Sequence, residues 1–115
     1  PILLEVNIGG EASKSGTDPA ELWALLEAAA AQPSVRVRGL MTIPPVEEKP
    51  GEARRWFAAM RRLFDEAADR WRGDDRAKME VLSMGMSADF EQAIAEGATL
   101  VRVGTAIFGP RVYKV

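Results

Sequence analysis

The stretch MEVLSMGMSADFEQAIAEGATLVRV, residues 79–103, decides the fold class of this 115-residue chain. It opens on an apolar strand pattern, MEVLS at 79–83, and closes on another, ATLVRV at 98–103. Between them, ADFEQAIAE at 88–96 has helical spacing, and Ser87 is placed to cap its start. A strand, a helix and a strand in this order predict two parallel strands joined by a crossover helix.

The same alternation extends over the rest of the chain. ILLEVNI at 2–8 and VRVRGLMTI at 35–43 read as strands, and a helix between them starts at Asp18 with Pro19 in its first position. A longer helix before residue 79 carries one apolar face, formed by Trp56, Met60, Leu63, Phe64, Ala67 and Trp71. The order β-α-β-α-β-α-β predicts an α/β fold with four parallel strands. It fits either half of an eight-stranded barrel or a small open sheet.

Composition excludes several kinds of function. Hydrophobic residues make up 47% and charged residues 28%, and the net charge of −2 gives no support to nucleic-acid or membrane-surface binding. Cysteine and histidine are both absent, so we expect no metal site and no histidine base. No apolar run is long enough to span a membrane and no signal peptide is evident, which favours the cytoplasm. Because the chain opens in mid-strand at Pro1, we expect residues 1–115 to be one domain cut from a longer polypeptide.

Two loops at the carboxyl ends of predicted strands have the composition of a phosphate site. SMGMS places Ser87 at the mouth of a helix, and RVGT offers the Gly104 amide and the Thr105 hydroxyl from the next strand. The alternative is that the glycines are turn residues and Ser87 is only a cap. The residues by themselves support the two interpretations equally.

Arg102 is unusual because it lies inside an apolar strand. If Val101 and Val103 face the helices, the guanidinium points into a barrel or its mouth. The alternative is a structural salt bridge with Glu5 or Glu80, which also lie in predicted strands. Chemistry alone slightly favours the salt bridge.

The segment LSMGMSADFEQAIAEGATLVRVGTAIFGPR, residues 82–111, closely resembles the C-terminal signature of the pyridoxal-phosphate homeostasis proteins. These are small proteins that bind pyridoxal 5'-phosphate (PLP) in a single alanine-racemase-type barrel. VNIGGEASKSG at 6–16 and RGLMTIP at 38–44 resemble further stretches of the same family. The resemblance implies that the chain is the C-terminal half of a TIM-type (β/α)8 barrel of the alanine racemase N-terminal-domain type.

The resemblance also implies a cofactor site. Ser87, Gly104 and Thr105 match the family's phosphate cradle, and Arg102 matches the arginine that faces the pyridine nitrogen. An arginine there keeps that nitrogen unprotonated and so weakens the ring as an electron sink. Two further residues at strand ends are possible cofactor neighbours: Asn7 and Met41.

The family's Schiff-base lysine has no counterpart in this chain. The four lysines, none of which matches the family's position, are Lys14, Lys49, Lys78 and Lys114. The resemblance places that lysine in the first half of the barrel. The expected partners are therefore PLP and either the missing N-terminal half or another copy of the chain, with no nucleic acid and no membrane.

Three functions remain open on the sequence. The resemblance implies a non-catalytic PLP-binding protein of intracellular vitamin B6 homeostasis. A racemase or decarboxylase of the same cofactor class would need a further domain with a catalytic tyrosine, and Tyr113 is the only tyrosine here. The third possibility is a phosphate-binding or purely structural half-barrel.

Overall fold

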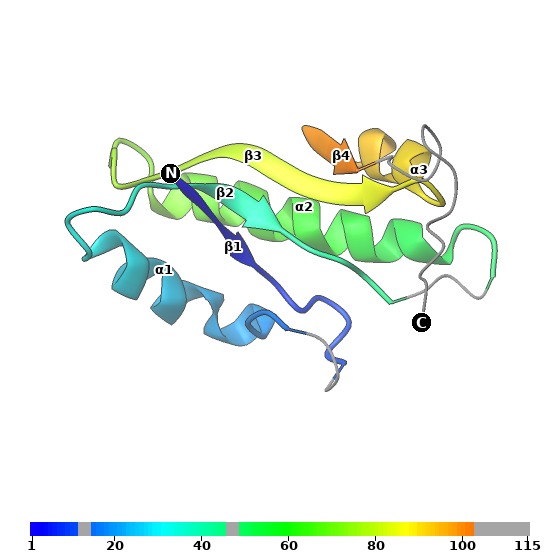
Figure 1. Cartoon of the computed structure of the whole chain (residues 1–115), viewed down its shortest axis with the longest axis horizontal. Coiled ribbons are helices and arrows are strands. Elements are labelled where there is room, and N and C mark those ends of the chain that lie inside the picture. The colour runs from blue at the N-terminus through cyan, green and yellow to red at the C-terminus, as the bar shows by residue number, and fades with distance from the viewer. Residues whose placement is uncertain (12–14, 46–48, 103–115) are drawn as a thin grey trace, which may run out of the picture.

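The computed structural model describes residues 1–11, 15–45 and 49–102, and these form one four-stranded sheet with its helices (Figure 1). The elements are β1 (Ile2–Glu5), the 3-10 turn η1 (Pro19–Glu21), α1 (Leu22–Ala30), β2 (Val37–Met41), α2 (Glu52–Arg70), β3 (Ala77–Met86), α3 (Phe90–Ala95) and β4 (Leu100–Arg102). All strand pairs are parallel, in the spatial order β1-β2-β3-β4. The predicted α/β fold with four parallel strands is confirmed.

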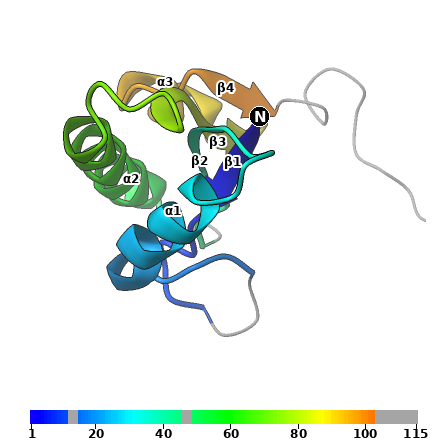
Figure 2. The same cartoon turned by 90° about the vertical axis from the view of Figure 1, so that its left-hand side faces the viewer.

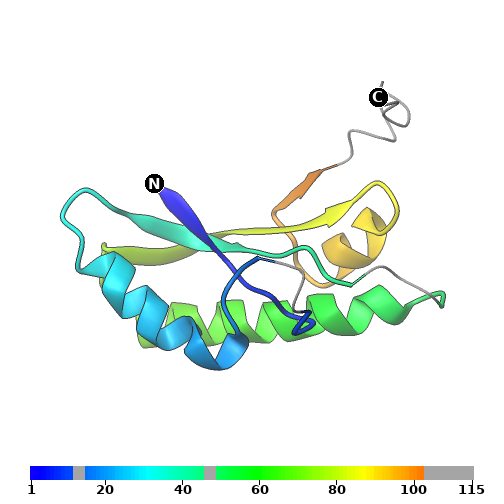
Figure 3. The same ribbon diagram turned by 60° about the horizontal axis from the view of Figure 1, so that its bottom comes forward.

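The helices lie on a single face of this sheet. Figure 3 shows α1 and α2 beneath the strands, and the end view in Figure 2 shows all three helices to one side of them. Each crossover therefore moves one strand further in the same direction, which is the winding found in β/α barrels. A doubly wound sheet would reverse its strand order and carry helices on both faces.

The core lies between the helices and the inner side of the sheet. Leu4, Leu40 and Leu82 occupy matching positions on three neighbouring strands, and all three are buried. The helices cover them with fully buried side chains, namely Leu22 and Leu26 from α1 and Phe57, Met60 and Ala67 from α2. Part of the predicted apolar face of α2 is thus confirmed, whereas the sequence pattern had not singled out Phe57.

The opposite side of the sheet, which we call the open face, is not covered by any described helix. Leu3 and Val81 lie on it, both in register with Gly39, and they are half-buried. Together with Pro1, Ile2, Arg38 and Leu100 they line a mainly apolar hollow of about 280 Å³. Ile2 and Leu100 keep 40% and 49% of their surface exposed, which is high for apolar strand residues.

The start of α3 differs from the prediction. The helix begins at Phe90 with Asp89 as its N-cap, so the expected capping role of Ser87 is wrong. The reason is a tight turn in which Asp89 Oδ1 accepts the Met86 N–H at 2.8 Å and Met86 O accepts the Asp89 N–H at 3.1 Å. Ile94, expected to face inward, is 54% exposed.

Candidate functional site

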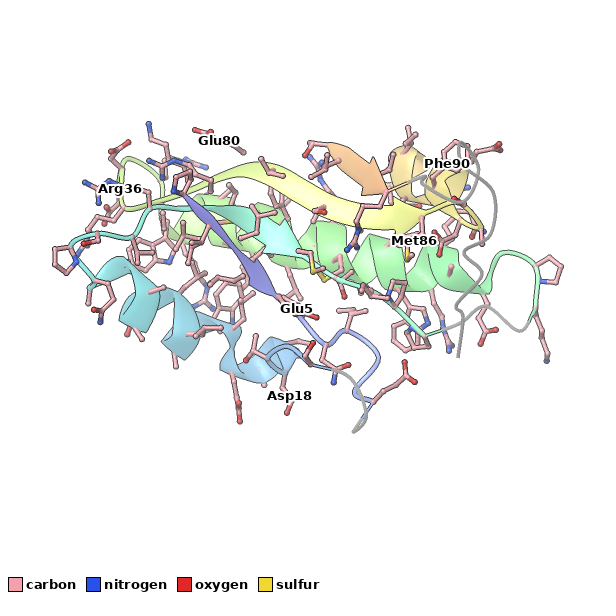
Figure 4. All side chains as sticks on the ribbon, viewed as in Figure 1. Glu5, Asp18, Arg36, Glu80, Met86 and Phe90 are labelled. Atoms are coloured by element: carbon pink, nitrogen blue, oxygen red, sulfur yellow. The ribbon has the colours of Figure 1, made fainter. Side chains whose placement is uncertain are left out.

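Because the strands are parallel, their carboxyl ends meet at one edge of the sheet. This edge gathers Met41, Met86 and Arg102 from β2, β3 and β4. In Figure 4, Glu5 and Met86 lie toward this edge, and Arg36 lies at the opposite end of the sheet. The candidate site residues that the structure describes, Ser87 and Arg102, are therefore on the edge where parallel α/β proteins hold their ligands.

Arg102 projects from the open face. Its neighbour Val101 packs against the core, and alternation along β4 turns Arg102 the other way. The guanidinium reaches the end of β2, where Nη2 donates to the Thr42 carbonyl oxygen at 3.4 Å. Arg102 Nε is buried and has no hydrogen-bond partner among the described residues. A buried donor without an acceptor is costly, so Nε is a candidate to donate to a group outside the described residues.

The salt bridge considered for Arg102 is not formed. Neither Glu5 nor Glu80 lies within ion-pair distance of the guanidinium, although all three residues belong to the described part of the chain. Glu5 Oε1 instead accepts the Ser15 hydroxyl at 2.8 Å. Glu80 is exposed, and Figure 4 shows it toward the other end of the sheet from Met86.

Ser87 lies in the turn between β3 and α3. It is half-buried and lines a hollow of about 230 Å³ formed by residues 87–92 at the start of α3. Asp89 and Glu91 line the same hollow, and Asp89 Oδ1 accepts the Met86 N–H at 2.8 Å. The other two predicted cradle residues, Gly104 and Thr105, lie outside the described residues.

Gly85, in the same SMGMS loop, has a packing role. It lies within β3 at φ +103°, and a Cβ there would come within 2.7 Å of Ala93 Cβ and 3.2 Å of Val101 Cγ1. A side chain at this position would therefore separate β3 from α3 and β4. The missing side chain therefore lets β3, α3 and β4 pack closely together.

Of the two possible cofactor neighbours, Asn7 is already engaged. Its side-chain amide donates to the Glu11 carbonyl at 2.7 Å and accepts the Glu11 N–H at 3.2 Å, which closes the loop after β1. Met41 is half-buried, opposite Glu5 and Ser83 in the sheet register. Met41 thus lies at the carboxyl edge of the sheet, whereas Asn7 stabilises a turn.

The described lysines do not offer a covalent anchor. Lys49 and Lys78 are exposed, and Nζ of Lys78, at the start of β3, pairs with Oδ1 of Asp75 in the preceding connection at 3.1 Å. Lys14 and Lys114 lie outside the described residues. A lysine that forms an imine at neutral pH needs a desolvated position, which neither described lysine has.

Thr42 and Ser83 were not singled out from the sequence. They are the buried polar side chains of the described residues, and both lie at the carboxyl edge, directly after β2 and within the last part of β3. The sequence did contain a pattern that could have identified them. Each is a hydroxyl residue near the end of an apolar run, Thr42 shortly before Pro44 and Ser83 shortly before Gly85. Buried hydroxyl groups need hydrogen-bond partners, and at a strand end these partners are usually backbone groups whose positions the hydroxyl then fixes.

Two negative findings apply to the described residues. Among them, no group of three or more acidic side chains is arranged to hold a metal ion. None of their helices combines the length and the apolar character that crossing a membrane requires.

The chain is similar to proteins of known family. The family model of the alanine racemase N-terminal domain matches residues 1–112. The pyridoxal phosphate homeostasis proteins of Aquifex aeolicus and Pseudomonas aeruginosa are 48% and 49% identical over 97% of this chain, covering 47% and 45% of their own lengths. PipY of Synechococcus elongatus, solved with PLP bound, superposes with a TM-score of 0.70 at 37% identity over 91% of this chain and 49% of its own. The chain thus spans about half the length of these relatives.

Proposed function

The chain belongs to the alanine racemase N-terminal domain family, and we propose that it is the C-terminal half of a PLP-binding barrel. Its function in this proposal is that of the pyridoxal phosphate homeostasis proteins, which are its relatives at 38–49% identity. Two features support the half-barrel assignment: the strands follow one another in a single direction across the sheet with all described helices on one face, and the other face is apolar and open. A second half would cover that face and pair with both edge strands.

Arg102 is the observation that carries the cofactor assignment. Its Nε is buried without a partner among the described residues, and its Nη2 is held by Thr42. An unprotonated pyridine nitrogen is a hydrogen-bond acceptor, and Arg102 Nε–H could donate to it. PLP supplies an electron sink when its ring nitrogen is protonated, and an arginine opposite that nitrogen disfavours protonation. The residue therefore fits a role in holding PLP without catalysis.

We assign the phosphate to Ser87, Gly104 and Thr105. The hollow beside Ser87 supports this assignment, and the sequence resemblance supplies the other two residues. Since the described residues that line the hollow include Asp89 and Glu91 and no basic residue, the phosphate in this proposal is held by N–H and O–H donors rather than by net positive charge. The Schiff-base lysine belongs, in this proposal, to the half that the chain does not include.

The experiment is to combine the chain with the remaining half of the Aquifex aeolicus relative and to titrate PLP by absorbance. Replacing Ser87 and Thr105 together by alanine should weaken PLP binding about 100-fold or more, since each lost hydrogen bond to a charged phosphate is worth roughly 1.5 kcal/mol. Ser34→Ala, which removes an exposed hydroxyl between α1 and β2, is the matched control and should bind PLP normally. Equal affinity of the double variant and the control would contradict the phosphate assignment.

A catalytic function and a cofactor-free structural function are the alternatives. Racemisation of alanine by the combined halves, above the rate with free PLP, would favour the first. Stable pairing of the halves with no affinity for PLP or phosphate would favour the second. The names of the relatives, which are homeostasis proteins, support neither alternative.

A further inference from the structure

Thr42 connects three strands at the carboxyl edge of the sheet. It follows β2 directly and is fully buried. Its hydroxyl donates to the Val6 carbonyl oxygen at 2.6 Å, and its N–H donates to the Ser83 carbonyl oxygen at 3.0 Å. Its own carbonyl oxygen accepts Arg102 Nη2 at 3.4 Å. One residue thus joins Val6, directly after β1, Ser83 within β3, and the side chain of Arg102 from β4.

The hydroxyl takes the place of a backbone donor. The ladder between β1 and β2 continues past the named strands, because the Val6 N–H donates to Met41 O at 2.8 Å. Pro44, which has no N–H, and Pro45 then prevent β2 from continuing. The hydroxyl of Thr42 supplies the donor that Val6 O takes, so it fixes the backbone at the point where the ladder ends.

The position of Arg102 depends on this backbone. The Thr42 carbonyl is the one hydrogen-bond partner of the guanidinium among the described residues, and Nε has none. Within the described part of the chain, a shift of the Thr42 carbonyl therefore removes the one hydrogen bond that holds the guanidinium. We propose that Thr42 is a positioning residue, whose hydroxyl fixes its own carbonyl and thereby the direction of Arg102 Nε. Its relevance to PLP rests on the proposed function, whereas the effect on Arg102 does not.

The first test needs no cofactor and uses the whole chain. Arg102 Nε–H is assigned in a ¹⁵N–¹H spectrum with the help of Arg102→Lys, and its hydrogen exchange is compared among variants. Thr42→Val, which keeps the shape and removes the hydroxyl, should speed exchange about fivefold, whereas Thr42→Ser should stay within about twofold of the wild type. Thr17→Val is the matched control. The Thr17 hydroxyl donates to the Asp18 carbonyl oxygen at 3.3 Å and not to the backbone that holds Arg102.

Each outcome decides the proposal. Equal exchange in Thr42→Val and Thr17→Val would overturn it, and so would failure of Thr42→Ser to restore protection. If Thr42→Val does not fold, the unaltered chain still tests the geometry. Nuclear Overhauser contacts between the Arg102 side chain and the Thr42 backbone are expected there, and their absence would overturn the proposal.

A second test concerns the cofactor. In the chain combined with the remaining half of the Aquifex aeolicus relative, Thr42→Val should change the pH dependence of the PLP absorbance, and Thr42→Ser should restore it. An unchanged pH profile, with Arg102 shown by exchange to be released, would mean that Arg102 does not face the ring nitrogen. That result would contradict the proposed function and leave the positioning role intact.

Discussion

Gly85 shows how one missing side chain shapes the site. Its φ of +103° is unfavourable for any other residue, and a Cβ would overlap Ala93 and crowd Val101. Gly85→Ala should therefore destabilise the fold by roughly 2–4 kcal/mol, the sum of backbone strain and overpacking. Chemical denaturation measures this change in the free energy of unfolding.

Gly73→Ala is the control that separates the two contributions. Gly73 also has a positive φ, +81°, yet a Cβ there would meet nothing within 4 Å. Its replacement should cost about 1 kcal/mol, from the backbone alone. An equal cost at both positions would show that the contact of Gly85 with α3 and β4 contributes nothing.

The contacts of Gly85 and the cap of α3 could not be predicted from the sequence. The sequence offered the SMGMS glycine as part of a phosphate loop or as a turn residue, whereas Gly85 lies within β3 at a positive φ. Which elements meet there depends on tertiary packing, because Ala93 and Val101 follow Gly85 by 8 and 16 residues and lie on different elements, α3 and β4. Ser87 had the right chemistry for a cap, but Asp89, two residues later, closes the turn instead.

At the scale of elements, the connection from α2 to β3 is organised by charge. Arg76 hydrogen-bonds both carboxylate oxygens of Asp74, with its Nη2 2.7 Å from Asp74 Oδ2, and lowers the pKa of Asp74 from 3.8 to about 2. Asp74 is therefore more acidic in the folded chain than in the unfolded one. Its contribution to stability is present above pH 4 and is lost as the pH falls toward 2.

Arg76→Gln should reverse most of this shift but not all of it, because the backbone N–H of residue 76, which also donates to Asp74 Oδ1 at 3.0 Å, is retained. We expect the titration midpoint of Asp74, followed by the NMR signal of its carboxyl carbon, to rise from about 2 toward 3.8. The difference in stability between the wild type and the variant should shrink between pH 4 and pH 2. Arg72→Gln, whose arginine pairs with Asp69 at 2.6 Å, should leave the Asp74 midpoint unchanged. A low Asp74 midpoint in Arg76→Gln would contradict the assigned cause.

The order of elements was predictable because apolar periodicity changes between strand and helix along the chain. Element lengths were less so. β3 runs over Ala77–Met86, well beyond the predicted 79–83, because its partners β2 and β4 extend the ladder at both ends. The pattern likewise favoured Trp56 for the buried face of α2, whereas Phe57 is the fully buried residue. The rotation of a long amphipathic helix about its own axis is set by its tertiary contacts, so the sequence pattern alone does not fix which of two neighbouring residues is buried.

For the whole molecule, local sequence could predict parallel strands but not how the sheet is wound. A crossover helix satisfies the same periodicity on either face of a sheet, so the choice between a barrel half and an open doubly wound sheet was left to the family resemblance. The structure places every described helix on one face and leaves Leu3 and Val81 on the other. The remaining half of the proposed barrel would cover this apolar surface.

Val81→Asp tests this use of the open face. Val81 is half-buried in an apolar hollow with Leu3 and Leu100, so a carboxylate there would be desolvated when a second half covers the face. Pairing with the remaining half of the Aquifex aeolicus relative should weaken roughly 100-fold or more, since an unpaired carboxylate in an apolar layer costs on the order of 3 kcal/mol. Ala68→Asp is the matched control. It adds the same charge at an exposed position of α2, away from the open face, and this variant should pair normally. Sedimentation of the mixed halves measures the pairing. If Val81→Asp and Ala68→Asp paired with equal affinity, the second half would have to contact the chain elsewhere, and the barrel arrangement would be wrong.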